Sequence, residues 1–239
     1  MDDSVPFAPS AVAPSATRPL LGQTILVVED SRYACDAMRL MCLHSGARIR
    51  RADCLKSARR HLRVYRPSIA IVDLGLPDGS GTDLIEDLDT ANPRVGVIMA
   101  TSGDDNLKEA ALASGADGFL SKPLSSVGAF QQAILDKLPV DRRPAGPRVL
   151  SDDVIDPDPM AYRDDMSHVA NLLDDHQEGP VLDYVLQFLS GVARSAEDGQ
   201  LVEAADDLAG SLKNKSELGA KVARLSGMVH ERLNQRVAI

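Results

Sequence analysis

The sequence predicts an α/β fold, a doubly wound five-stranded parallel sheet, followed by an all-α helical bundle. Two observations carry this prediction. Within 24–138, short apolar runs rich in β-branched residues alternate five times with amphipathic helical stretches, as expected of a parallel sheet with helices on both faces. From 158 onward the strand pattern disappears, and apolar residues recur at the helical spacing of three and four residues.

The predicted strands differ in how deeply they should be buried. Apolar runs at 24–28, 69–72 and 95–100 predict strands buried on both faces, whereas the basic, alternating run at 47–52 predicts a strand near the sheet edge. A fifth strand is predicted at 117–121. Helices are expected between and after these strands, at 31–45, 55–65, 82–90, 104–114 and 125–138.

The chain divides into four predicted segments. Residues 1–22, rich in Pro, Ala and Ser, predict a disordered leader, and they lack the basic stretch and apolar core of a secretory signal. The strand and helix alternation predicts one domain at 23–139. Pro and Asp residues predict a linker at 140–157, and the remaining 158–239 predict an acidic bundle of four helices, with Asp158 as its first cap.

Composition and charge narrow the possible functions. The net charge of −9 arises entirely from residues 151–239, which contain 17 acidic and 8 basic residues. Such a half would be repelled by phosphate backbones, so a nucleic-acid-binding output is disfavoured. No apolar run approaches the roughly 18 residues of a membrane span. The three cysteines are odd in number and lack CxxC spacing, which indicates reduced thiols in a cytoplasmic protein.

Four of the five predicted strands end in polar groups that suit phosphoryl chemistry. The first ends at Glu29 and Asp30, the third at Asp73, the fourth at Thr101 and the fifth at Lys122. Because the carboxyl ends of parallel strands share one edge of a sheet, these groups can converge. Two carboxylates about 4 Å apart repel each other by about 4 kcal/mol at an effective dielectric constant near 20. A divalent cation with oxygen ligands, such as Mg²⁺, would remove that repulsion.

Each group also has an ordinary explanation when it is considered alone. Asp73 could start a turn, Thr101 could cap a helix, and Lys122 could be an exposed charge. Their occurrence at equivalent strand ends favours a site. A carboxylate can attack a phosphoryl group, and Asp73 stands alone at the end of the central strand, so it is the best candidate nucleophile. A lysine and a hydroxyl would supply the cation and hydrogen-bond donor that a phosphoryl group needs.

With these groups, residues 23–139 resemble the receiver domain of two-component response regulators. The motifs that carry the resemblance are VVED at 27–30, IVDLGLPDGSG at 71–81, MATS at 99–102 and SKP at 121–123. The resemblance implies a flavodoxin-like receiver fold with Asp73 as the phosphoacceptor. It implies Mg²⁺ bound by Glu29, Asp30 and Asp73 and by the backbone carbonyl of Gly75.

The same resemblance implies roles for the later motifs. Lys122 would take part in the chemistry and would be followed by a cis peptide bond, and Thr101 and Phe119 would reorient together as a switch. The phosphoryl group would come from a phosphohistidine on a histidine kinase or a histidine phosphotransfer protein. The first helix and neighbouring loops would form the partner-docking surface, for which the candidates here are Arg32, Tyr33 and Met38.

The second half contains one further, weaker resemblance. The segment LAGSLKNKSELGA at 208–220 resembles the signature of histidine phosphotransfer domains, with Lys213 and a Leu-Gly-Ala stretch in place. Gly210 occupies the position of the phosphoaccepting His, and the spacing is one residue short. A degenerate phosphotransfer domain and an ordinary amphipathic helical pair both explain this segment.

These features predict a response regulator phosphorylated on Asp73 that signals through a non-DNA-binding helical output. The bundle would bind a downstream protein or form a homodimer. No enzymatic activity is expected beyond Mg²⁺-dependent self-phosphorylation and dephosphorylation, since no nucleophile, metal or nucleotide motif follows residue 140. The alternative is a phosphorelay intermediate or phosphate sink without a switched output.

Overall fold

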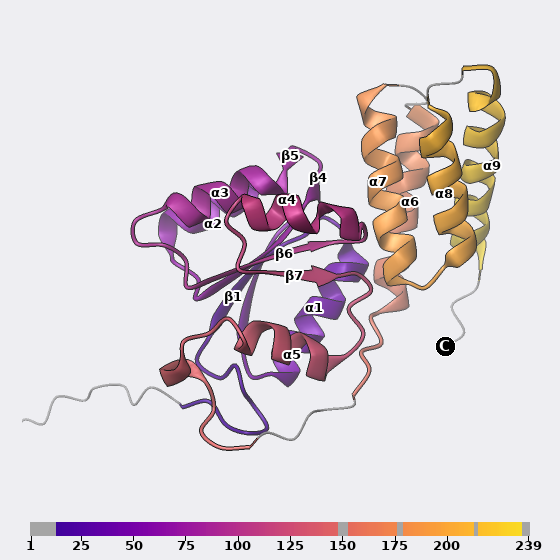
Figure 1. Cartoon of the computed structure of the whole chain (residues 1–239). Helices are drawn as coiled ribbons and strands as arrows, with labels where there is room; N and C mark the ends of the chain where they lie inside the picture. The colour runs from indigo at the N-terminus through magenta and orange to yellow at the C-terminus, as the bar shows by residue number, and fades with distance from the viewer. Residues whose placement is uncertain (1–12, 148–152, 176–178, 213–214, 236–239) are drawn as a thin grey trace, which may run out of the picture.

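The computed structural model describes residues 13–147, 153–175, 179–212 and 215–235, and it shows a sheet covered by helices beside an upright helical bundle (Figure 1). The main sheet is parallel throughout, with strand order β2-β1-β3-β6-β7. Its strands are β1 (Thr24–Val28), β2 (Arg48–Ala52), β3 (Ile69–Asp73), β6 (Val97–Ser102) and β7 (Gly118–Ser121). The predicted five-stranded parallel sheet is confirmed, with the basic strand β2 at an edge.

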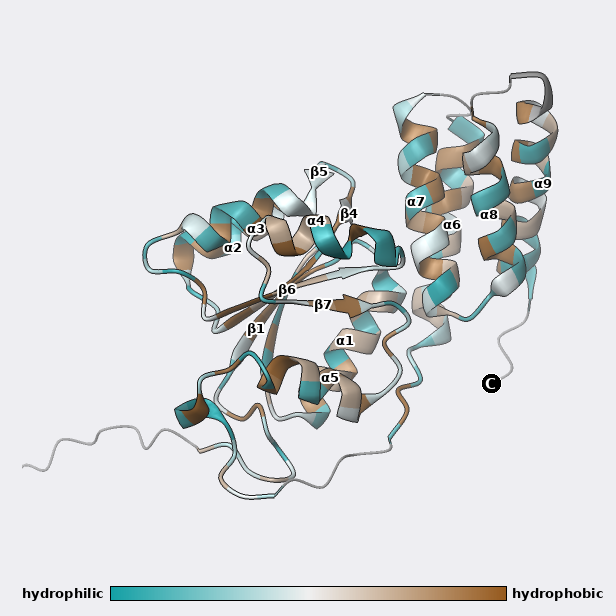
Figure 2. Ribbon diagram, viewed as in Figure 1, coloured by the Kyte–Doolittle hydropathy of each residue, from teal (hydrophilic) through white to brown (hydrophobic). Residues whose placement is uncertain are grey.

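Alternate residues of the strands enter separate cores on the two faces of the sheet. In β1, Ile25 and Val27 belong to the core on one face, with residues of α1 and α5, whereas Leu26 and Val28 belong to the other, with residues of α2, α3 and α4. The helices are α1 (Arg32–His44), α2 (Leu55–Val64), α3 (Gly81–Thr90), α4 (Lys108–Ala113) and α5 (Val127–Leu135). In Figure 2 the inner strands of the sheet, away from the basic edge strand β2, are largely hydrophobic, as burial on both faces requires.

Two local features differ from the predicted elements. A small antiparallel hairpin, β4 (Gly75–Leu76) and β5 (Gly79–Ser80), occupies the turn after β3, where no strand was predicted. The helix predicted from residue 104 begins with a short 3₁₀ turn, η1 (Asp105–Leu107), and α4 is correspondingly short. Asp104 caps that turn by accepting a hydrogen bond from the Asn106 amide at 3.0 Å.

The packed chain extends beyond the predicted borders of the first domain. Leu20 is fully buried, and its amide donates to the Ser45 carbonyl at 2.9 Å, so the core reaches back into the stretch predicted as a disordered leader. Residues 1–12 lie outside the described residues. After α5, a 3₁₀ turn, η2 (Val140–Arg142), begins the stretch predicted as a linker.

The end of the predicted linker lies against the first domain. Val154 pairs with Ser126 in an antiparallel bridge, and the Ile155 amide donates to the Ser125 carbonyl at 3.0 Å. The Ile155 side chain is buried in the core shared by α1 and α5. The linker is therefore fixed to the sheet domain at this point, although residues 148–152 lie outside the described part of the chain.

The second half forms the predicted four helices. These are α6 (Pro159–Asp175), α7 (Pro180–Ser195), α8 (Gly199–Ser211) and α9 (Lys215–Asn234), with α6 and α8 each packed against both α7 and α9. Asp158 caps α6 as predicted and accepts a hydrogen bond from the Met160 amide at 2.9 Å. The bundle has its own core, which includes Met166, Val169, Leu189, Leu208 and Leu225. Hydrophobic and hydrophilic bands alternate along its helices in Figure 2. Within the residues described, no helix combines the length and the apolar character needed to span a bilayer.

Candidate functional site

Three carboxylates meet at the carboxyl edge of the sheet. Glu29 and Asp30 directly follow β1, and Asp73 is the last residue of the adjacent strand β3. One oxygen from each of these side chains lies within 4.8 Å of the others. Glu29 and Asp73 are buried, with 3% and 7% of their surface exposed. The parallel pairing of β1 and β3 therefore places three acids in a space with little water to screen them.

A buried lysine partly balances this charge. The Lys122 ammonium lies 2.7 Å from Glu29 Oε2 and 3.1 Å from Asp73 Oδ2, and its side chain is only 4% exposed. Burial lowers the pKa of Lys122, but the negative charges of Asp73 and Glu29 outweigh this effect, so its pKa lies above the ordinary value. Lys122 is therefore a permanent cation beside Asp73. The Lys122–Pro123 peptide bond is cis.

One cation does not neutralise three carboxylates. Burial raises the pKa of Asp30 to about 7, and the negative charge of Asp73 is the second cause of this rise. The same two causes raise the pKa of Glu29 well above its ordinary value. Both carboxyls thus have a tendency to hold a proton that a divalent cation would displace. The donor set consists of hard oxygen atoms and suits such a cation.

Thr101 lies beside this cluster on the adjacent strand β6, and Phe119 lies on β7, the strand beyond β6. Thr101 is opposite Asp73 in the β3–β6 register and is fully buried. Its hydroxyl donates to the Leu120 carbonyl at 2.8 Å, toward β7. Phe119 is half-buried and pairs with Ala100 across β6 and β7.

Two side chains from the bundle also reach this edge of the sheet, and neither was predicted. The Tyr184 hydroxyl on α7 donates to Asp30 Oδ2 at 2.8 Å. The Asp165 carboxylate on α6 accepts hydrogen bonds from the Ser31 hydroxyl at 2.8 Å and from the backbone amides of Arg32 and Tyr33 at 2.9 and 3.0 Å. Asp165 is 2% exposed. Contacts from the second half therefore reach the acidic cluster itself.

The sequence contains a signal for both of these residues. Asp165 lies on the apolar stripe of α6, three residues after Tyr162 and four before Val169. Tyr184 lies on the apolar stripe of α7, one turn before Phe188. A carboxylate within an apolar stripe is unusual because buried charge requires partners. The pattern could have identified Asp165 as an interface residue, but not its partner.

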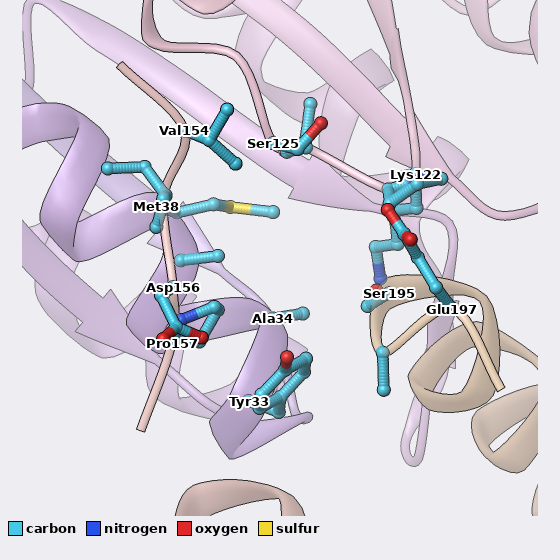
Figure 3. Close-up of a pocket in the computed structure, with 15 residues that line it drawn as sticks. Tyr33, Ala34, Met38, Lys122, Ser125, Val154, Asp156, Pro157, Ser195 and Glu197 are labelled. Carbon is cyan, nitrogen blue, oxygen red and sulfur yellow. The ribbon is translucent and has the colours of Figure 1, made fainter. Parts of the chain in front are cut away.

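Of the three residues expected to form the partner-docking surface on the first helix, Arg32 is exposed, Tyr33 is half-buried and Met38 is buried. The Tyr33 ring packs edge-on against Tyr162, with ring centroids 5.6 Å apart, and Arg32 forms an exposed ion pair with Asp164 at 2.6 Å. Met38 is fully buried and lines a cavity of about 230 Å³ between α1, the linker and the corner between α7 and α8 (Figure 3). Lys122 and Glu197 lie on the opposite wall of that cavity.

Gly210 on α8 occupies the position of the phosphotransfer histidine and has no imidazole. Gly210 is exposed on α8, and no atom lies within 4 Å of the place where its Cβ would be. The neighbouring Lys213 falls outside the described residues. The bundle contacts the acidic cluster through Tyr184 of α7 and the start of α1 through Asp165 of α6.

Comparisons with known proteins identify the first half. The family model described as "Response regulator receiver domain" matches residues 25–134. The transcriptional regulatory protein KdpE of Escherichia coli is 33% identical over 107 residues, which cover 45% of this chain and 47% of KdpE. The virulence transcriptional regulatory protein PhoP of Salmonella typhimurium is 33% identical over 114 residues, or 46% of this chain and 51% of PhoP.

The two curated relatives named above match less than half of this chain. The chain spans about half the length of the curated relatives it matches. A solved two-component response regulator from Clostridium difficile is 20% identical, with a TM-score of 0.44, and its match covers 48% of this chain and 94% of that one. The family match ends at residue 134, before the linker and the bundle.

Proposed function

Because residues 25–134 form a response regulator receiver domain, we propose that this protein is a two-component response regulator phosphorylated on Asp73 that signals through its helical half. The position of Asp73 carries the proposal. Its carboxylate ends the central strand β3, lies with Glu29 and Asp30 in one acidic cluster, and is 3.1 Å from the Lys122 ammonium. A nucleophilic carboxylate, a set of oxygen ligands and a fixed cation are the parts that phosphoryl transfer needs.

The phosphodonor is a phosphohistidine on a histidine kinase or a histidine phosphotransfer protein. An Asp73 oxygen attacks phosphorus and the P–N bond breaks. The imidazole, which carries a proton on its other ring nitrogen, takes the bonding electron pair and leaves as the neutral ring. Glu29, Asp30, Asp73 and the Gly75 carbonyl would hold Mg²⁺, which would supply positive charge to the phosphoryl oxygens. Water later hydrolyses the acyl phosphate, and no other enzymatic activity is proposed.

Lys122 and Thr101 convert phosphorylation into a change of shape. The Lys122 ammonium, already beside Asp73, binds a phosphoryl oxygen. The Thr101 hydroxyl leaves the Leu120 carbonyl, to which it donates at 2.8 Å, and turns to another phosphoryl oxygen. Phe119 then moves into the space beside β6. This pair is the proposed switch.

The output of the regulator is a protein–protein interaction or a homodimer of the helical half. The relatives named above are transcriptional regulators, but their similarity to this chain is limited to the receiver half. Residues 151–239 carry the whole net charge of −9, which opposes contact with nucleic acid. The hydrogen bond between Tyr184 and Asp30 links the bundle directly to the proposed site, which favours a switched output over a phosphate sink.

Beryllofluoride with Mg²⁺, which mimics the phosphoryl group on Asp73, tests this output. The unmodified protein is expected to change its oligomeric state or its affinity for a captured partner, as measured by light scattering and by pull-down from a cell extract. Asp73→Asn is the matched control and should not respond. If beryllofluoride binds Asp73 but changes neither property, the chain is a phosphate sink or relay intermediate.

Removal of the Lys122 ammonium should leave phosphorylation of Asp73 possible but reduce the conformational change that follows it. Lys122→Ala is expected to accept phosphate on Asp73 but to show a much smaller conformational response, because no cation then pulls on the phosphoryl group. Without Mg²⁺ the variant should also lose about 3 kcal/mol of unfolding free energy, because the buried acids lose their neutralising partner. Urea unfolding with and without Mg²⁺ measures this loss and its recovery. Lys137→Ala, which removes an exposed lysine on the same domain, should behave as the wild type.

A further inference from the structure

One face of α7 lies across the ends of three adjacent strands. Tyr184 donates to the carboxylate that follows β1. The Gln187 side chain packs on Gly75, just after β3, so closely that a Cβ on that glycine would be 2.4 Å from the Gln187 amide nitrogen. Arg194 packs on Gly103, just after β6, with its Cδ 3.0 Å from the corresponding Cβ position. Asp73 ends the middle one of these strands, so α7 covers the edge that contains it (Figure 1).

A second contact, from α6, is buried and fully hydrogen-bonded, as polar contacts in a protein interior usually are. Asp165 is buried and accepts three hydrogen bonds from the first residues of α1. The amides at the N-terminus of a helix lack partners within the helix, and a negative charge there is favourable. Ser31, the N-cap of α1, both accepts from the Ala34 amide and donates to Asp165. The bundle thus completes the cap of the helix that follows the acidic pair.

These contacts leave little room for a phosphodonor. The Asp73 side chain is 9% exposed and that of Lys122 is 4% exposed. The Tyr184 hydroxyl also uses one carboxylate oxygen of Asp30, a residue proposed to hold the cation. Part of the α1 surface that a protein donor would use is covered by α6, through the contact of Tyr162 with Tyr33.

We infer that the helical bundle blocks the phosphorylation site of the unphosphorylated protein, with Asp165 and Tyr184 as the docking residues, and that it must move away before Asp73 receives a phosphoryl group. The inference rests on the proposed phosphorylation of Asp73 and adds the regulation of that site. The occupant of the donor surface is part of the same chain, helices α6 and α7, rather than a second protein.

The coupling must work in both directions. The docking equilibrium of the bundle and the phosphorylation equilibrium of Asp73 are linked. If docking lowers the equilibrium constant for phosphorylation by some factor, phosphorylation lowers the equilibrium constant for docking by the same factor. The phosphoryl group therefore exposes the surface of α7 and α6 that faces the receiver. This surface, rather than the outer face of the bundle, is the one that a downstream partner would recognise only after phosphorylation.

Hydrogen exchange of the Arg32 and Tyr33 amides reports docking directly, because both donate to Asp165. Beryllofluoride with Mg²⁺ is expected to lower their protection by about tenfold in the full-length protein, which is the scale of one lost hydrogen bond to a charged group. Asp165→Ala should lower their protection without beryllofluoride, and it should increase the rate of Asp73 labelling by phosphoramidate by about tenfold.

Two further variants make the test specific. Tyr184→Phe keeps the ring that packs on Phe188 and removes only the hydroxyl, so the fold is retained while the contact with Asp30 is lost. It should also be labelled faster. Asp174→Ala removes an exposed acid at the far end of the same helix as Asp165 and should match the wild type in both measurements.

The outcomes separate the inference from the proposed function. If Asp165→Ala and Tyr184→Phe are labelled at the wild-type rate, or if beryllofluoride binds Asp73 and leaves the amide protection unchanged, the block is contradicted while the phosphorylation of Asp73 stands. If no form of the protein is labelled and ¹⁹F NMR detects no bound beryllofluoride, the proposed function is wrong and the block is rejected with it.

Discussion

Asp73→Asn is expected to abolish labelling of the protein by phosphoramidate in the presence of Mg²⁺. The amide lacks the negative charge and the nucleophilic oxygen that attack phosphorus, and it is a poorer ligand for a cation. Glu29 and Asp30 remain in place, but neither ends the central strand. The change should reduce labelling to the background of an unfolded control, as measured by phosphate-affinity electrophoresis or intact mass.

Asp83→Asn provides the matched comparison. Asp83 is an exposed carboxylate in the first turn of α3, and its change to Asn should leave labelling intact. Thermal unfolding of both variants shows whether the fold is retained. Stoichiometric labelling of Asp73→Asn would show that another residue accepts the phosphoryl group and would overturn the assignment.

Gly81→Ala is expected to be the most disruptive single-methyl change in the receiver half. Gly81 is the first residue of α3, and its amide donates to the Leu74 carbonyl at 3.1 Å. A Cβ at this position would lie 2.0 Å from the backbone oxygen of Asp73. Backbone atoms cannot rotate away, so either α3 or the end of β3 must shift. We expect a loss of about 3 kcal/mol of unfolding free energy and a slower labelling of the displaced Asp73.

Gly227→Ala is the control for this change. Gly227 is exposed in the middle of α9, and no atom lies within 4 Å of its Cβ position. Alanine should therefore stabilise the protein by roughly 0.5–1 kcal/mol, the usual preference of a helix interior for Ala over Gly. Urea unfolding measures both variants. Wild-type stability and labelling of Gly81→Ala would contradict the close approach of α3 to the phosphoacceptor.

The sheet and the site were predictable because they depend on short-range patterns. Buried strands such as β1 and β3 are runs of β-branched residues, and the side chains at their ends must share one edge when the strands are parallel. The exact limits of β6 were less predictable. The predicted strand covers 95–100, whereas β6 begins at Val97 and ends at Ser102. Thr101 and Ser102 are polar but belong to the strand because they pair with β3 or β7.

The contacts between the halves could not be read from the sequence. The Tyr184 hydroxyl and Asp30 are separated by 154 positions, and the Asp165 carboxylate and the Ser31 hydroxyl by 134. An apolar stripe with one acid in it indicates that the acid has a partner but not which helix supplies it. The hairpin of β4 and β5 was missed for a related reason, since two-residue strands carry no periodicity.

The buried side chain of Ile155 determines how far the bundle can travel. Only residues 156–158 connect it to Pro159, the first residue of α6, and the four steps from Ile155 to Pro159 span about 13 Å when extended. So short a tether holds the bundle near the receiver at an effective concentration in the millimolar range, rather than at the concentration of the protein in solution. Release from the site is therefore a swing about this tether that is independent of dilution. A separate bundle added at micromolar concentration would compete poorly with the one already attached.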